Sequence, residues 1–173
     1  MKITTKRLIL RPFEDDDFND IHQLLSDPEV MRFSLNGPYS KEKTASFMAY
    51  CIQRSQNSQP SLLAIIDKKT NKFMGSCGFF AQKILAKQEI ELGYRLSKQY
   101  WGKGFATEAT IAVKQYAFNE MGLTRLISLI EKDNIASIAV AEKNGFKLEK
   151  ELLYDGRINV CIYALSVENK KGD

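Results

Sequence analysis

A strand, a glycine turn and a helix follow one another directly over residues 89–109, and this succession constrains the fold more than any other feature. Apolar and polar residues alternate from Ile90 to Leu96, which predicts a strand. Gly102 and Gly104 lie in the turn that follows, and an alanine-rich helical pattern begins directly after it. Glycine allows close approach of the backbone, and a helix N-terminus offers unpaired N–H groups and partial positive charge. The segment therefore predicts a site for a phosphorylated cofactor.

Length and composition limit the class of protein. The chain has 173 residues, and we expect 1–173 to be a single domain with a core of its own. Hydrophobic residues make up 44% of it and charged residues 27%, as in ordinary globular proteins. No apolar run approaches the roughly 20 residues of a membrane helix, and the start of the chain is typical of a strand, not a signal peptide. A net charge of +4 is too small and too scattered to indicate nucleic acid. We therefore expect neither membrane nor nucleic acid as a partner.

The cysteines Cys51, Cys77 and Cys161 are widely spaced and include no CxxC pair. An odd number without such a pair argues against a disulfide framework and against a zinc site, so we expect no metal. Free thiols persist in reducing compartments, which predicts a cytoplasmic protein.

Periodicity and turn residues together predict a mixed α/β fold. Strands are expected over residues 7–11, 62–66, 73–80, 89–96, 125–130, 147–154 and 157–166. Helices are expected after the carboxylates at 15–17, from Ser40, over 105–120, and from Asn134 to Asn144-Gly145. Asp155-Gly156 is typical of a hairpin between the last two strands, and Gly93 within 89–96 is compatible with a β-bulge.

This order carries a resemblance to a known family. WGKGFATEA after the strand at 89–96 and NIASIAVAEKNGF after the strand at 125–130 resemble the GNAT N-acetyltransferase superfamily. The opening TKRLILRPFEDDD and the later DPEVMRF resemble its branch that acetylates ribosomal-protein N-termini. The resemblance covers essentially the whole chain. It implies an α/β fold whose mixed, mostly antiparallel central sheet, flanked by helices, splays between the strands at 89–96 and 125–130.

The resemblance also implies acetyl-CoA as the acetyl-donor cosubstrate. The family's phosphate-binding motif, Arg/Gln-x-x-Gly-x-Gly/Ala, falls on residues 101–106, where Trp101 replaces the usual basic or amide residue. Backbone N–H groups from Gly102 to Thr107 would bind the phosphates, whereas the alternative is a glycine turn that merely joins strand to helix. Asn134 would either reach the pantetheine arm or cap its helix. The implied cofactor-binding residues are Tyr94, Arg95, Leu96, Gly102, Lys103, Gly104, Phe105, Ala106, Thr107 and Asn134.

Two side chains are candidates for the chemistry. An attacking amine must lose a proton, and Glu91 lies where the resembling branch carries its strand glutamate, so Glu91 is the predicted base, acting directly or through a water. The alternative is an ordinary exposed carboxylate. Ser137 is the candidate acid for the departing thiolate, or else a helix serine bonded to an upstream carbonyl. Ala141 stands where many relatives carry a tyrosine acid, so that mechanism is not available from this position.

The acceptor site is the least defined part of the prediction. The candidate acceptor-binding residues are Met31, Arg32, Phe33 and Tyr39, together with residues 154–159. Arg32 would bind an acidic tail of the acceptor. His22 is expected at the surface, and Glu108 is expected to be structural because it lies inside its helix.

The resulting prediction is direct acetyl transfer, within a ternary complex, to a primary amine of a protein or peptide N-terminus. The alternatives are a small-molecule amine such as a polyamine or an antibiotic, and a non-catalytic CoA-binding module. The sequence does not distinguish a monomer from a homodimer.

Overall fold

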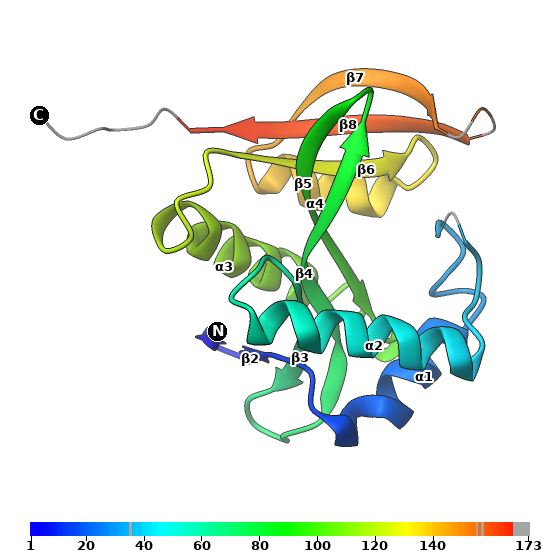
Figure 1. Ribbon diagram of the computed structural model, residues 1–173, viewed down its shortest axis with the longest axis vertical. Coiled ribbons are helices and arrows are strands. Elements are labelled where there is room, and N and C mark those ends of the chain that lie inside the picture. The colour runs from blue at the N-terminus through cyan, green and yellow to red at the C-terminus, as the bar shows by residue number, and fades with distance from the viewer. Residues whose placement is uncertain (35, 155, 157, 168–173) are drawn as a thin grey trace, which may run out of the picture.

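The computed structural model describes residues 1–34, 36–154, 156 and 158–167, and its strands form one sheet (Figure 1). The sheet has eight strands in the order β1-β2-β3-β4-β5-β6-β8-β7. The strands are β1 (Ile3–Thr4), β2 (Leu8–Arg11), β3 (Leu62–Asp67), β4 (Phe73–Ile84), β5 (Lys87–Leu96), β6 (Arg125–Glu131), β7 (Lys147–Tyr154) and β8 (Ile158–Ser166). Every neighbouring pair is antiparallel except β5 and β6. The predicted mixed, mostly antiparallel sheet is therefore confirmed.

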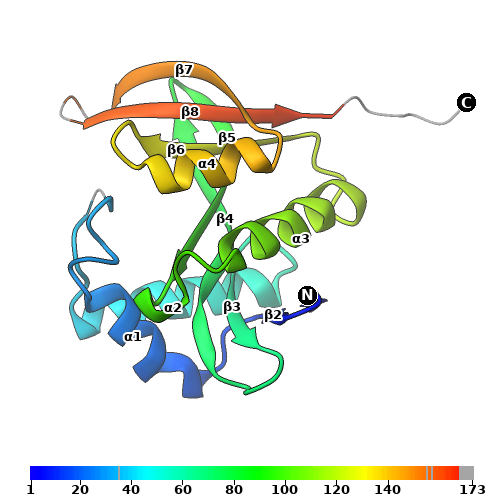
Figure 2. The same cartoon turned by 180° about the vertical axis from the view of Figure 1, so that it is seen from behind.

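Helices cover both faces of the sheet. They are α1 (Phe18–Ser26), α2 (Lys41–Gln56), α3 (Phe105–Asn119) and α4 (Ile135–Lys143), with short 3-10 turns η1 (Asp15–Asp17) and η2 (Lys98–Tyr100). Figure 1 shows α2 in front of the sheet, and Figure 2 shows α3 and α4 on the opposite side, while α1 packs with α2 into one apolar cluster. The caps follow the sequence signals: the Ser40 hydroxyl accepts a hydrogen bond from the Lys43 N–H at 3.2 Å, and α4 ends before Gly145.

The two faces of the sheet bury two separate groups of apolar side chains. Strand alternation sends Leu63 and Ile65 of β3 toward α3, into a cluster that includes Val113. The intervening residues Leu62, Ala64 and Ile66 pack against the apolar residues of α1 and α2. A central strand that is apolar on both faces is the pattern expected when helices cover both sides.

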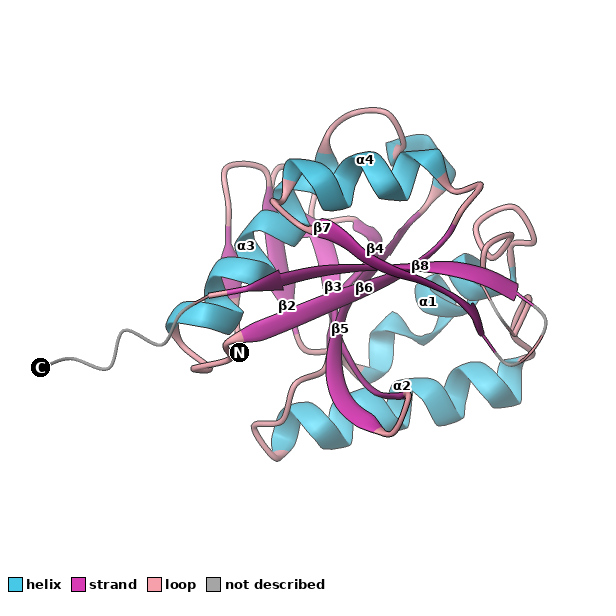
Figure 3. Ribbon diagram, turned by 90° about the horizontal axis from the view of Figure 1, so that it is seen from above, coloured by secondary structure: helices cyan, strands magenta, loops and turns pink. Residues whose placement is uncertain are grey.

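Strands β5 and β6 diverge almost as soon as they meet. They share one ladder pair, Glu91 with Ile127, which is parallel. Beyond it β5 runs across the direction of β6 and β8, as Figures 1 and 3 show. The implied splay between these strands is confirmed, and it leaves the β6-facing edge of β5 without a strand partner after Glu91.

Three details differ from the prediction. The short strand β1 was not predicted, and the β4–β5 hairpin extends to residues 84 and 87, turning at Leu85 and Ala86 with φ of +48° and +67°. The bulge at Gly93 is wrong, because Gly93 pairs with Gly78 in unbroken register. A Cβ on Gly93 would lie 3.0 Å from the Phe80 ring, so Gly93 allows close packing of that ring against the strand.

Candidate active site

A cavity of about 810 Å³ follows the divergence of β5 from β6 and receives residues from both faces of the sheet. We call its two sides the α2 half and the α3 half. The α2 half is lined by residues of the 29–39 segment, by Phe47 and Tyr50 of α2, by Phe80 and Gln82 of β4, and by Glu91 and Arg95 of β5. The α3 half is lined by Tyr94 and Leu96, by the turn before α3, by Ser128–Glu131, and by α4.

The turn before α3 has the backbone needed to bind an anion. Gly102 and Gly104 are left-handed, with φ of +70° and +77°, a conformation that L side chains rarely adopt. Both glycines line the cavity, as do Phe105 and Ala106 at the start of α3, where N–H groups have no partner within the helix. The Trp101 indole N–H donates to the Leu96 carbonyl at 2.7 Å and so ties the turn to the end of β5.

Two predicted members of this turn lie away from the cavity. Lys103 and Thr107 are not among its lining residues. The Lys103 ammonium donates to the Gln99 carbonyl at 2.7 Å, and the backbone carbonyl of Lys103 accepts from the Arg7 guanidinium at 3.0 Å. The turn therefore offers backbone donors more than side-chain charge.

The direction of the β5 peptide groups decides which of them face the gap. The Leu92 carbonyl accepts from the Ser128 hydroxyl of β6 at 2.8 Å, and the Leu96 carbonyl accepts from Trp101, so the peptide groups of even-numbered residues point toward the gap. Tyr94 lies between them and presents its N–H and C=O there. The Arg95 carbonyl instead lies against Gly75 of β4. The Arg95 peptide, which was predicted to meet the pantetheine arm, therefore belongs to the β4 ladder and faces away from the gap.

Glu91 lies at the point where the two strands part, and it lines the cavity. Its carboxylate accepts a hydrogen bond from the Gln82 side chain at 2.7 Å. Burial raises the pKa of the Glu91 carboxyl, against the hydrogen bonds from Gln82 and the Leu129 backbone and the charge of Arg95. A partly buried carboxylate with a raised pKa is suited to accept a proton near neutral pH.

The first turn of α4 brings Ser137 and Asn134 to the α3 half. The Asn134 side-chain oxygen accepts from the Ser137 N–H at 3.2 Å, so Asn134 caps the helix while also lining the cavity. The cap uses only the oxygen, and the amide NH2 of Asn134 keeps its capacity to donate. The Ser137 hydroxyl lies 3.3 Å from the Tyr94 hydroxyl. Burial raises the pKa of Tyr94, so the phenol stays protonated at neutral pH.

The predicted acceptor residues divide between cavity and core. Arg32, Phe33 and Tyr39 line the α2 half, and Tyr154 of β7 also lines the cavity. Met31 is buried in the cluster under α1 and α2, so its prediction as an acceptor residue is wrong. The predicted residues at positions 155 and 157 lie outside the described residues.

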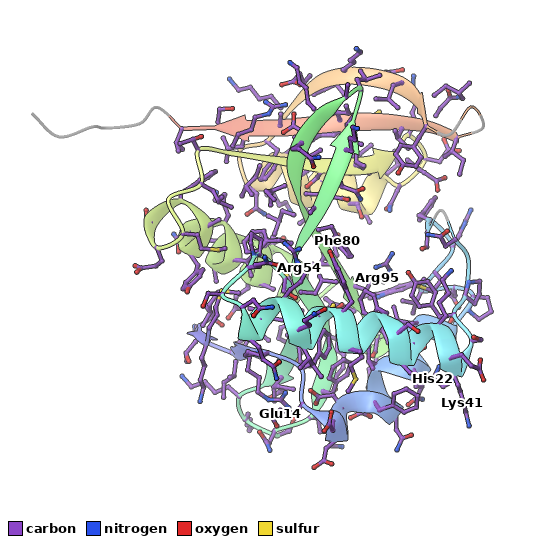
Figure 4. All side chains as sticks on the ribbon, in the orientation of Figure 1. Glu14, His22, Lys41, Arg54, Phe80 and Arg95 are labelled. Carbon is purple, nitrogen blue, oxygen red and sulfur yellow. The ribbon has the colours of Figure 1, made fainter. Side chains whose placement is uncertain are left out.

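Sequence reasoning missed two groups that the fold brings to the α2 half. Gln82 lay in a segment that the pattern left unassigned, and the extended hairpin places it beside Glu91. The Arg95 side chain also points here, and it donates to the Ser34 hydroxyl at 3.2 Å. Figure 4 shows Arg95 and Phe80 between α2 and the diverging strands. Odd-numbered β5 residues share the face of Glu91, and this is the signal that points to Arg95.

Other candidates have roles away from the cavity. Glu108 accepts from the Thr5 hydroxyl at 2.6 Å and from the Arg7 backbone N–H at 2.9 Å, and it forms an ion pair with the Arg7 guanidinium. His22 is partly buried rather than at the surface, stacked on Phe18 with its Nδ1 3.0 Å from the Thr44 hydroxyl. Within the described residues no cluster of metal-ligating side chains occurs, and no helix has the length and apolarity to cross a membrane.

Comparison with known proteins identifies the family. The sequence model of the acetyltransferase (GNAT) domain matches residues 7–147. The chain belongs to the GNAT family. It is 34% identical over 149 residues to the uncharacterized N-acetyltransferase p20 of Bacillus licheniformis, covering 84% of this chain and 82% of that protein. It is 28% identical to the spermidine N(1)-acetyltransferase of Escherichia coli, covering 87% and 78% of the two chains.

One solved GNAT structure bears on the cofactor. The ribosomal L7/L12 alpha-N-protein acetyltransferase RimL in complex with coenzyme A superposes with a TM-score of 0.82, over 96% of this chain and 98% of that one, at 24% identity. That likeness shows the shared fold. The residues here fit a CoA molecule on their own account, because left-handed glycines at a helix N-terminus suit phosphates and the unpaired edge at Tyr94 suits an amide-bearing arm.

Proposed function

We propose that this GNAT acetyltransferase moves the acetyl group of acetyl-CoA to the α-amine of a protein or peptide N-terminus, by direct attack within a ternary complex. The observation that carries the proposal is the continuity of the cavity, which joins the α3 turn to the α2 half past Glu91. A thioester lying along the gap and an amine entering from the α2 half would meet beside this carboxylate.

The α3 half would bind the cosubstrate. The N–H groups between Gly102 and Ala106 would hold the phosphates, and the Tyr94 peptide would pair with the arm as a further strand would. The amide NH2 of Asn134 is a second candidate donor for the arm. Acetyl-CoA supplies the activated acetyl group, and the protein holds it in the gap.

Glu91 would act as the general base. An N-terminal α-amine has a pKa of about 8, so it is mostly protonated at pH 7 and is then not nucleophilic. Glu91 in its carboxylate form would accept that proton first, and the neutral nitrogen would then attack the thioester carbon. The hydrogen bond from Gln82 holds the carboxylate in one orientation, which positions it for this transfer.

Ser137 would donate a proton to the departing thiolate. The Ser137 hydroxyl lies on the α3 half, 3.3 Å from the Tyr94 hydroxyl. Tyr94 would then give Ser137 a proton in place of the one it donated. The demand for an acid is modest because a thiol has a pKa of about 8.5, so the thiolate is a tolerable leaving group. Ala141 is buried in this helix and supplies no acid.

A covalent intermediate on cysteine does not fit the structure. Cys51, Cys77 and Cys161 are all buried, and none of the three lines the cavity. Burial raises the pKa of Cys51 to about 11, and it raises the pKa of Cys77 further, so both remain thiols. Direct transfer needs no such nucleophile.

A polyamine is the second candidate acceptor, favoured by the similarity to the spermidine N(1)-acetyltransferase. A thiol-release screen with acetyl-CoA separates the two. Its arms are peptides with free N-termini, the same peptides blocked at the N-terminus, spermidine and an aminoglycoside. Release with free but not blocked peptides supports the proposal. Release confined to spermidine or the aminoglycoside refutes it.

A further inference from the structure

Two arginines in the α2 half have no carboxylate partner among the residues that the structure describes. The Arg95 guanidinium is partly buried and donates to the neutral Ser34 hydroxyl at 3.2 Å. The Arg32 guanidinium lies over the Phe33 ring, 5.2 Å from its centroid. Neither forms an ion pair across residues 1–34, 36–154, 156 and 158–167, and both line the cavity.

The carboxylates of the α2 half form no ion pair with either arginine. Glu29 forms an ion pair with Lys98, with 2.9 Å between Oε2 and Nζ. Glu91 accepts from Gln82, and it lies four residues from Arg95 on the same strand, beyond ion-pair distance. Two arginines thus face one carboxylate that has no ion-pair partner among the described residues, Glu91, whose charge acts on Arg95 without an ion pair, and this side of the cavity keeps a net positive charge.

Burying a cation without a counterion is costly, and an anion bound beside it recovers part of that cost. Burial lowers the pKa of Arg95, yet an arginine keeps its charge at any physiological pH. A guanidinium with a single hydroxyl partner has donors to spare for a carboxylate, which it binds through two parallel hydrogen bonds. Arg95 can therefore bind an anionic ligand.

The spacing along β5 relates this charge to the reacting amine. Glu91 and Arg95 point to the same face, and four residues of strand separate their Cα atoms by about 13 Å. Side chains reaching toward each other shorten that distance. An extended peptide whose amine lies at Glu91 would bring the side chain of its second or third residue to Arg95.

We propose that Arg95 binds a carboxylate of the acceptor, so that the preferred substrate is an amine with an acidic group within its first three residues. Arg32, which is exposed and lines the same half, adds its positive charge. This inference rests on the proposed function, since it takes the α2 half as the acceptor side. Polyamines, which are cations throughout, are poor acceptors in this arrangement.

The test compares matched peptides on the whole protein. Peptides beginning Ser-Asp-Asp and Ser-Asn-Asn differ only in charge, and kcat/KM is measured for wild type, Arg95→Gln, Arg95→Lys and Lys83→Gln. Lys83 is an exposed cation of β4 outside the cavity lining and serves as the control. We expect wild type to favour the acidic peptide by roughly 10- to 100-fold, as for one charge-assisted hydrogen bond.

Arg95→Gln should remove this preference by slowing the acidic peptide far more than the amide peptide, with CoA affinity unchanged. Any slowing common to both peptides would come from the loss of the Arg95 charge, which lowers the pKa of Glu91. Arg95→Lys should retain part of it, and Lys83→Gln all of it. Equal slowing of both peptides by Arg95→Gln, or a wild-type preference for the amide peptide or spermidine, overturns the inference. Free aspartate and glutamate form a separate arm. If they are acetylated with the same dependence on Arg95 while no peptide is, the role of Arg95 stands and the peptide acceptor fails.

Discussion

Replacing Glu91 with glutamine tests the proposed base while changing the cavity least. The substitution keeps the size of the side chain, and its amide oxygen can still accept the hydrogen bond from Gln82. It removes only the capacity to take a proton. Stability and CoA affinity should therefore remain close to those of the wild type.

The size of the effect follows from proton transfer. General bases contribute about 10²- to 10⁴-fold to the rate. We expect Glu91→Gln to lower kcat by about 100-fold at pH 7, near the lower end of that range, because part of the amine is already neutral at this pH. That factor corresponds to about 2.7 kcal/mol of activation free energy. At pH 7 an α-amine with a pKa of about 8 is roughly one-tenth neutral. The variant should therefore recover about tenfold between pH 7 and pH 9 as the free amine accumulates.

The pH profile of the wild type should differ in shape. Glu91 acts only when ionised, so activity is lost as pH falls through the pKa of Glu91, which burial raises above its ordinary value. The acidic limb set by Glu91 should thus lie at a higher pH than an exposed glutamate would give. Glu91→Gln should lack this limb and show only the one set by protonation of the amine.

Initial rates of thiol release under saturating acetyl-CoA, from pH 5 to pH 9, supply both measurements. Glu89→Gln is the matched control, because Glu89 lies on the same strand, forms an ion pair with Arg125 and does not line the cavity. The reasoning is refuted if Glu91→Gln retains more than about a third of the wild-type kcat at pH 7 with CoA affinity unchanged, far above the loss expected of a base.

Three further predictions address the cosubstrate turn, a structural carboxylate and the acid. Gly104 and Gly122 both have left-handed φ, so Gly104→Ala and Gly122→Ala should each lower the free energy of unfolding by roughly 1 kcal/mol. Only Gly104 lines the cavity, so only Gly104→Ala should weaken CoA binding in calorimetry. Equal CoA affinities of the two variants would contradict the role of the turn. Burial acts to raise the pKa of Glu108, but its hydrogen bonds lower the pKa overall. Glu108→Gln should therefore lower the free energy of unfolding, measured in urea at pH 7, by about 1 kcal/mol. The difference from wild type should shrink as acid protonates the wild-type carboxylate. A deficit constant with pH would show that the charge of Glu108 does not matter. Ser137→Ala should lower kcat about tenfold at pH 7, and by less above the thiol pKa of about 8.5. Ser46→Ala, on the exposed part of α2, is the control and should leave kcat unchanged. Equal kcat for the two variants would exclude Ser137 as the acid.

The sequence predicted the elements whose burial pattern is regular. Residues 89–96 and 105–120 follow strand and helix periods closely, because each packs one face against the core. The tip of the β4–β5 hairpin was missed because it extends past the helices. There, exposed residues such as Lys83 and Lys87 erase the alternation that marks a half-buried strand.

The candidate site was harder to predict where it depends on register. That Tyr94 and Arg95 line the cavity follows from the motif, but which of them turns its peptide toward the gap depends on the pairing with β4, which one sequence does not specify. The placement of Gln82 beside Glu91 depends on the same pairing. Met31 was misassigned because a loop has no regular period that would show which of its residues is buried in the core.

The central claim is that acetyl passes directly from CoA to an amine across one cavity. Mass spectrometry of the intact protein, first with acetyl-CoA alone and then with an acidic peptide added, tests it most directly. We predict that no acetylated protein forms in the first step. In the second, each equivalent of thiol released should match one equivalent of peptide acetylated at its α-amine. An acetylated protein that forms with acetyl-CoA alone and then passes its acetyl group to the peptide would contradict the account.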